Sequence, residues 1–189
     1  MALLRMRNAT FARETLSAGP VTVDVGPGRR AALTFASAGE AAIVALMAAG
    51  IVKASAGSVL IGDYDPRIQS VHCKRIAAFV PHEPIALHER DFARYIAYRA
   101  ALWNVEPRRA LTQASLLRER LGDLHEAFAF SIVGALVGMP KIVVLDRPAP
   151  AYAEQILSAI GSLALFSTHL GADSARAFGR ADEAVATQA

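Results

Sequence analysis

The feature that most constrains the fold is a continuous apolar run, Ile-Val-Val-Leu, at residues 142–145. The run follows a segment with a helical pattern, and it is too short to be a helix itself. Apolar residues at successive strand positions require both faces of the strand to be covered, which is typical of a parallel sheet packed between helices. We therefore expect residues 142–145 to form a central, buried strand.

Strands and helices alternate along most of the chain. Short apolar or alternating segments predict strands at residues 21–25, 31–35, 58–61, 77–80 and 163–167. Apolar residues three and four positions apart predict helices at residues 40–52, 91–105, 110–121, 128–138, 153–160 and 171–178. This order predicts an α/β fold with a mainly parallel sheet flanked by helices.

The stretch of about residues 91–138 interrupts the alternation because it contains helical patterns only. We expect one domain over residues 1–189, with a helical subdomain at about residues 91–138 inserted into the α/β core. Helical spacing places six side chains of its first helix on one side: Phe92, Tyr95, Ile96, Arg99, Leu102 and Trp103. For the aromatic members, packing in the core is favoured over an interface with a membrane subunit.

Composition argues against several classes of protein. Hydrophobic residues make up 53% of the chain and the formal net charge is +3, without a lysine-rich or arginine-rich tract, so disorder and nucleic-acid binding are not expected. The longest apolar run, residues 41–52, is shorter than the roughly 20 residues that span a membrane, so no direct membrane insertion is expected. One cysteine, Cys73, allows no intramolecular disulfide and fits a cytoplasmic protein.

Five short segments add information through their order along the chain. They are residues 28–33 (GRRAAL), 57–62 (GSVLIG), 78–84 (AFVPHEP), 136–148 (LVGMPKIVVLDRP) and 165–170 (LFSTHL). In this order they resemble the ATP-binding cassette (ABC) domains of transporters, and most closely the ATP-binding subunits of bacterial exporters. The resemblance implies a P-loop NTPase-like fold.

The phosphate loop of that family has the pattern G-x-x-x-x-G-K-[ST], whose lysine and hydroxyl bind the phosphates and Mg²⁺. Its counterpart here comprises Phe35, Ala36, Ser37, Ala38, Gly39, Glu40, Ala41 and Ala42. In the ungapped register Glu40 takes the last glycine position, Ala41 the lysine position and Ala42 the hydroxyl position. In the register shifted by one residue, Gly39 fits the last glycine and Glu40 replaces the lysine.

A carboxylate about 4 Å from a phosphate oxygen costs on the order of 4 kcal/mol at an effective dielectric near 20. The alternative role of Glu40 is that of a favourable first-turn residue of the helix.

The remaining family motifs are altered as well. Asp146 matches the Walker B aspartate, but Arg147 stands where the family has the catalytic glutamate, and a guanidinium cannot act as a base near neutral pH. A structural hydrogen bond or ion pair is the alternative role of Asp146. His82 replaces the glutamine of the glutamine loop, and a loop histidine bonded within the chain is favoured. His169 matches the switch histidine, and without a γ-phosphate we expect it to close the end of a strand.

The signature L-S-G-G-Q corresponds to Gly122, Asp123, Leu124, His125 and Glu126, which lack its serine and its pair of glycines. Asp123 and Glu126 would repel phosphate, but a capping box at the start of a helix is the favoured interpretation of that pair. Gly134 stands where the signature helix has an arginine. Phe11 is a weak candidate for stacking on adenine, and core packing is favoured for it.

Four further side chains, His72, Cys73, His82 and His88, match no common metal-binding pattern, so no metal site is expected. The sequence predicts a non-hydrolysing ABC-type subunit without a bound cofactor. It would dock to a membrane permease or another ABC-type subunit, in a homodimer or heterodimer, at the inner face of the cell membrane. The alternatives are a subunit with weak or rearranged ATP and magnesium binding and hydrolysis, and a soluble regulatory module without a membrane partner.

Overall fold

The computed structural model describes residues 1–84, 87–122 and 124–179 of the chain. The strands are β1 Leu4–Arg13, β2 Leu16–Val25, β3 Arg30–Thr34, β4 Ala56–Ile61, β5 Ala77–Val80, β6 Ile142–Asp146 and β7 Ala164–His169. The helices are α1 Ala38–Ala48, α2 Ser70–Ile76, α3 Phe92–Trp103, α4 Pro107–Leu121, α5 Glu126–Leu136, α6 Ala153–Ile160 and α7 Ala172–Phe178, and the short 3₁₀ turns are η1 Glu89–Asp91 and η2 Pro150–Tyr152.

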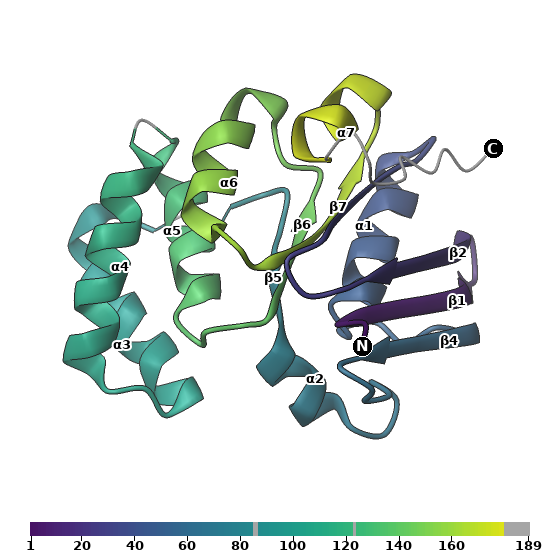
Figure 1. Cartoon of the computed structure of the whole chain (residues 1–189), viewed down its shortest axis with the longest axis horizontal. Helices are drawn as coiled ribbons and strands as arrows, with labels where there is room; N and C mark the ends of the chain where they lie inside the picture. The colour runs from purple at the N-terminus through teal and green to yellow at the C-terminus, as the bar shows by residue number, and fades with distance from the viewer. Residues whose placement is uncertain (85–86, 123, 180–189) are drawn as a thin grey trace.

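Two sheets organise the molecule (Figure 1). The first is parallel, with the order β3-β7-β6-β5, and the second is antiparallel, with the order β2-β1-β4. The predicted strand at residues 142–145 is β6, which lies inside the parallel sheet between β7 and β5. The predicted α/β class is therefore confirmed, and the antiparallel sheet adds a layer that the sequence patterns did not predict.

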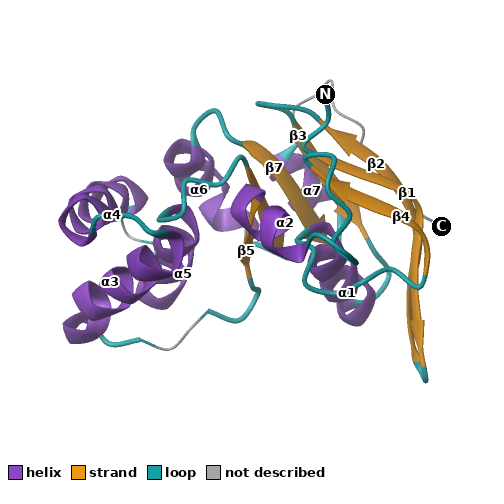
Figure 2. Ribbon diagram, turned by 90° about the horizontal axis from the view of Figure 1, so that it is seen from below, coloured by secondary structure: helices purple, strands orange, loops and turns teal. Residues whose placement is uncertain are grey.

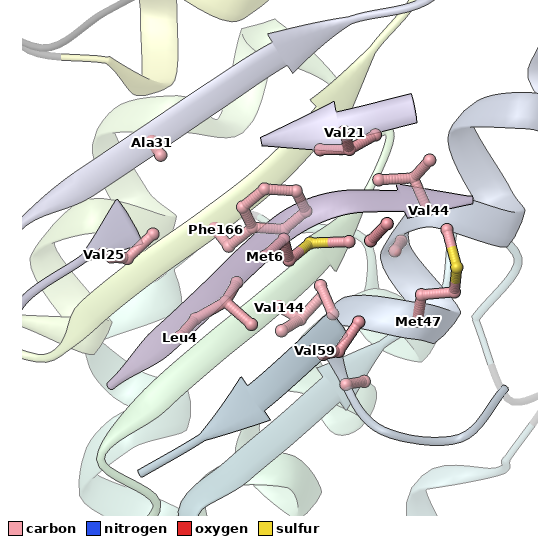
Figure 3. Close-up of a cluster of buried hydrophobic side chains, with 14 of the residues drawn as sticks. Leu4, Met6, Val21, Val25, Ala31, Val44, Met47, Val59, Val144 and Phe166 are labelled. Atoms are coloured by element: carbon pink, nitrogen blue, oxygen red, sulfur yellow. The ribbon is translucent and has the colours of Figure 1, made fainter. Parts of the chain in front are cut away.

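Strand β6 divides its side chains between two hydrophobic cores. Ile142 and Val144 pack into a core shared with α1 and the antiparallel sheet, which Figure 3 shows around Val144 and Phe166. Val143 and Leu145 point to the opposite core, which is formed with α3 to α6. Full burial of such side chains contributes about 1.5–3 kcal/mol each. Covering on both faces explains why polar residues are absent from positions 142–145.

Helix α1 lies between the two sheets, while α3, α4 and α5 gather on the far side of the parallel sheet (Figure 2). These three helices follow one another in the chain between β5 and β6. None of the helices within residues 1–84, 87–122 and 124–179 has the length and apolar character needed to cross a membrane.

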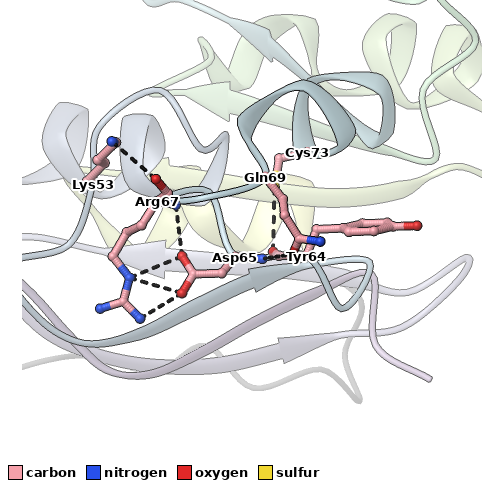
Figure 4. Close-up of polar contacts among 6 residues, drawn as sticks. All are labelled: Lys53, Tyr64, Asp65, Arg67, Gln69 and Cys73. Atoms are coloured by element: carbon pink, nitrogen blue, oxygen red, sulfur yellow. Dashed lines mark hydrogen bonds and ion pairs between the residues drawn. The ribbon is translucent and has the colours of Figure 1, made fainter.

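The connection from β4 to α2 is held by Asp65 (Figure 4). Its carboxylate accepts hydrogen bonds from the Arg67 guanidinium at 2.7 Å and from the Arg67 backbone N–H at 2.8 Å, and these bonds lower the pKa of the Asp65 carboxyl. Lys53, in the segment between α1 and β4, donates from Nζ to the Arg67 carbonyl oxygen at 3.3 Å. The turn is thereby tied to the segment that follows α1.

Several elements differ from the sequence-based expectation. Strand β1 and helix α2 were not predicted, and β2 begins at Leu16 rather than at residue 21. The side chain of Leu102, which helical spacing placed on the same side as Phe92, is 57% exposed. The buried residues of α3 are four positions apart, at Phe92, Ile96 and Ala100, and Leu102 falls outside that spacing.

Helix α3 packs closely against Gly134 of α5 and against Gly138, which lies in the turn two residues after the end of α5. A Cβ atom at Gly134 would lie 2.6 Å from Cζ of Tyr95, and one at Gly138 would lie 2.9 Å from Cδ2 of Trp103. Arg99 strengthens this contact, since its Nε donates to the Gly134 carbonyl oxygen at 3.0 Å. The missing side chains therefore set how closely the two helices approach.

We expect Gly134→Ala to reduce the free energy of unfolding by about 1–3 kcal/mol, because the added methyl group overlaps the Tyr95 ring. Gly39→Ala is a matched control, since it also lies in a helix but a Cβ there meets nothing within 4 Å. The control should be neutral or stabilise by up to about 1 kcal/mol. Urea denaturation of both variants tests the packing, and equal stability of the two would contradict it.

Candidate functional site

The altered family motifs meet at the carboxyl end of the parallel sheet. Strands β3, β7 and β6 run in the same direction with Thr34 beside His169 and Asp146 beside Thr168. The counterpart of the phosphate loop follows β3, and Arg147 follows β6. Ligands of open α/β sheets bind outside this end of the strands. The sequence-predicted residues on these three strands are thus brought together where a ligand would be expected.

The connection between β3 and α1 consists of residues 35–37 only. The Phe35 N–H donates to the His169 carbonyl oxygen at 2.9 Å, and the Phe35 side chain is buried. Ser37 is the N-cap residue of α1, and its Oγ accepts from the Glu40 N–H at 3.1 Å. The helix thus begins at Ala38, inside the segment that the family pattern assigns to an open loop, and these N–H groups already have acceptors.

Glu40 occupies the first turn of α1, as its alternative role predicted. A carboxylate there interacts favourably with the helix dipole. Its Oε1 also accepts a long hydrogen bond, 3.4 Å, from the Gly19 N–H of β2. Glu40 therefore ties the start of α1 to the antiparallel sheet and places a carboxylate beside the connection between β3 and α1.

Asp146 and Arg147 form an ion pair at the end of β6. The Arg147 guanidinium donates to both carboxylate oxygens, from Nε to Oδ1 at 2.8 Å and from Nη2 to Oδ2 at 3.1 Å. The Thr168 hydroxyl donates to the same Oδ1 at 3.3 Å, and Asp146 is only 6% exposed. The pair raises the pKa of Arg147 further. Asp146 is thus engaged in an ion pair in this structure, as its alternative role requires.

His169 is buried at the end of β7 with both ring nitrogens bonded. Nε2 lies 2.8 Å from Oγ of Ser167, and Nδ1 lies 2.8 Å from Oγ of Ser174 in α7. Its ring also lies 5.3 Å from the Phe178 ring, between centroids. Burial lowers the pKa of His169 to about 4, so the ring is neutral at pH 7. His169 was expected to close the end of its strand, and its bond to Ser174 also connects that strand end to α7.

A cavity of about 250 Å³ brings together His82, His125 and Arg147, three residues selected from the sequence. Pro84, Phe128, Ala149 and Tyr152 complete its lining. His82 lies on an exposed loop with Nδ1 3.0 Å from the Arg147 carbonyl oxygen, as expected for a bonded loop histidine. The cavity therefore joins the loop after β5, the start of α5 and the loop after β6.

The predicted capping box at the start of α5 is wrong. It required Glu126 in the third position of the helix, but α5 begins at Glu126 after the N-cap residue His125, whose side chain makes no capping bond. Asp123 lies outside the described residues. Gly122 ends α4 and Leu124 is buried, so the counterpart of the signature spans the α4–α5 connection.

Sequence reasoning missed the bonding partners of these residues. Thr168 and Ser167 lie next to His169 in a motif that the sequence identified, so their position could have indicated these hydrogen bonds, whereas nothing in the sequence indicated Ser174.

Phe11 packs at the edge of the core with α1, as expected. In the part of the chain that the structure describes, no three His, Cys, Asp or Glu side chains are grouped to hold a metal ion.

No protein-family model and no curated protein matches the chain, whereas many solved structures share its fold. The ATP-binding subunit of an ABC transporter is 15% identical with a TM-score of 0.71, over 88% of this chain and 79% of that one. CbiO1 of Clostridium perfringens, part of the ABC transporter complex CbiONQ, is 12% identical with a TM-score of 0.68, over 90% and 79%. A nucleotide-free ATP-binding cassette from an ABC transporter is 16% identical with a TM-score of 0.66, over 93% and 83%. At these identities the likeness establishes architecture, and the chain has the fold of the ATP-binding subunits of ABC transporters.

Proposed function

We propose that this chain is a non-hydrolysing ABC-type subunit that serves as a docking or regulatory component of a membrane export complex. The observation that carries the proposal is the bidentate pair of Asp146 and Arg147. In the family pattern, the aspartate helps bind Mg²⁺ and the next residue is the glutamate that acts on the attacking water. Here the aspartate is neutralised by a guanidinium, which has no lone pair to accept a proton.

The connection before α1 supports the same conclusion. A phosphate cradle needs glycines that let several backbone N–H groups point at one anion. Residues 35–37 are too few for the family loop, and Ser37 already accepts the N–H of Glu40. The Glu40 carboxylate would also repel a phosphate at this position. This described connection thus offers a phosphate neither the glycine-rich backbone nor the lysine of the family pattern, which supports weak or absent binding of ATP and Mg²⁺.

The proposed partners are a membrane permease subunit, another ABC-type subunit, or a second copy of this chain. CbiO1, a protein of the same fold, is part of a transporter complex, which supports a role in an assembly. We place this role in the cytoplasm at the inner membrane face. Helices α3 to α5 would form the helical subdomain of the cassette, inserted into one domain that spans the chain.

Purified protein should release no phosphate from ATP above the background of the assay. The reason is the replacement of the catalytic base by Arg147 and the engagement of Asp146. A phosphate-release assay with magnesium, with an active cassette ATPase measured in parallel, tests the prediction. Activity that copurifies with the protein and disappears in Asp146→Asn would contradict the proposal.

Magnesium-ATP should bind no more tightly than millimolar, and Glu40→Lys should not improve binding. A lysine supplies charge, but α1 still begins at Ala38 and no open loop is created. Two features could prevent ATP binding, the backbone geometry of the connection and the negative charge of Glu40, and calorimetry on the wild type and on Glu40→Lys separates them. Unchanged binding in the variant identifies backbone geometry as the cause, and a measurable gain in affinity identifies charge repulsion. Micromolar binding of ATP by the wild type would overturn the entire interpretation of the site.

Stability should fall by about 3 kcal/mol between pH 6.5 and pH 4 because of His169. The folded protein holds this histidine neutral with a pKa near 4, so on acidification the unfolded chain takes up the proton first. The loss begins near the ordinary pKa of 6.5 and levels off below about 4. Urea denaturation across this range should show a shallower slope in His169→Asn than in the wild type.

His88→Asn is the matched control for that series, because His88 is exposed and its side chain makes no capping bond. Its pH dependence should equal that of the wild type. If His169→Asn kept the full slope as well, carboxylate titration rather than the buried imidazole would be the cause.

A further inference from the structure

A second cavity, of about 480 Å³, lies away from the candidate site. It is bounded by α4 on one side and by the ends of α5 and α6 on the other, next to the amino ends of β6 and β7. Small side chains leave the space open: Ala110 and Ala114 of α4 face Ala159 of α6. Its volume falls in the range of small-molecule pockets. Asp146 and His169 lie at the opposite ends of these strands.

The lining of this cavity is apolar with one positive charge. Of the described residues that line it, only Gln113 and Arg120 have polar side chains. No acidic side chain lines the cavity, and Arg120 forms no ion pair with a residue in the described ranges. Gln113 and Arg120 lie seven positions apart on α4, about two turns, so the amide and the guanidinium share one side of the helix. An apolar space with a cation at its rim suits a molecule that combines hydrocarbon with an anion.

The size of the cavity decides between a small molecule and a partner helix. An α-helix about 10 Å wide fills roughly 420 Å³ for each 5.4 Å turn. The cavity would therefore enclose about one turn, whereas an amphipathic helix docks through anchors spread over about two turns. A flexible hydrocarbon chain can use the same space fully, because its conformation can follow the walls.

We propose that this cavity binds a single-chain amphiphile with a carboxylate or phosphate head group. The hydrocarbon chain lies against Ala110, Ala114 and Ala159, and Arg120 binds the head group, since its planar guanidinium can donate two parallel hydrogen bonds to either anion. Gln113 supplies a further donor on the same side of α4. The inference is independent of ATP hydrolysis and of the docking role proposed above.

Calorimetric titration with decanoate below its micelle concentration tests the site, with decyl phosphate and neutral decanol as companion ligands. The wild type should bind decanoate at one saturable site with a dissociation constant on the order of 0.1 mM. Arg120→Gln should weaken decanoate binding about tenfold and leave decanol binding unchanged. Arg94→Gln is the matched control, because it removes an exposed arginine of α3 that does not line the cavity. The ratio of decanoate to decyl phosphate affinity identifies the preferred head group.

Two further variants test the cavity itself. Ala159→Leu should weaken binding of all three ligands by narrowing the space, and circular dichroism establishes that the variant is folded. Leu116 lines the cavity but is 52% exposed, so Leu116→Glu places no charge in the buried core. The added carboxylate should repel the two anionic ligands, decanoate and decyl phosphate, and leave decanol binding unchanged. Absence of saturable binding in the wild type would overturn the proposal, as would wild-type affinity in Leu116→Glu. A dimer that dissociates in Leu116→Glu and binds no decanoate would likewise overturn it, in favour of an interface between copies of the chain.

Discussion

The burial of β6 on both faces is the constraint on which the rest of the structure depends. Ile142 and Val144 need α1 and the antiparallel sheet above them, whereas Val143 and Leu145 need the helices on the other side. If either layer were removed, apolar side chains of the central strand would be exposed to water. The residues that fulfil this requirement lie within the strands, and the polar residues of the candidate site lie where the strands end. The architecture therefore tolerates changes of the site residues, which is a physical reason why fold and activity can separate.

Several of the polar residues at those strand ends satisfy one another, whereas the buried hydroxyl of Thr34 at the end of β3 has no hydrogen-bond partner among the described residues. Asp146 is bonded by Arg147 and Thr168, and His169 is bonded by two serine hydroxyls. A buried polar group without a partner costs about 1–3 kcal/mol, so a site that loses its ligand must acquire internal partners or lose stability. Internal bonding at these positions is what such a replacement would produce, and it supports the proposed loss of nucleotide chemistry.

Sequence patterns predicted the elements with strong local signals and missed those without one. The strand at residues 77–80 and the helix at residues 153–160 have the predicted bounds, because each is a short apolar or amphipathic segment between clear breaks. Strand β1 was missed since its register shifts near Ala9 interrupt the apolar alternation, and α2 was missed since Cys73 is its only fully buried residue. The identity of the site residues could be predicted from motif order. Their partners could not, because contacts such as His169 with Ser174 depend on how α7 docks.

The arginine at position 147 has a consequence for the stability of the strand end. In the family pattern an aspartate and a glutamate stand side by side at the end of the Walker B strand, and two neighbouring carboxylates repel each other unless a cation lies nearby. An arginine at the second position converts that repulsion into a bidentate attraction that needs no metal. Under the proposed function, the same residue takes the place of the base and stabilises the end of β6. Active sites generally sacrifice stability for function, so a subunit released from catalysis can recover that stability by such a substitution. Arg147 adopts a left-handed backbone conformation, with φ of 44°, and the ion pair with Asp146 offsets part of that strain.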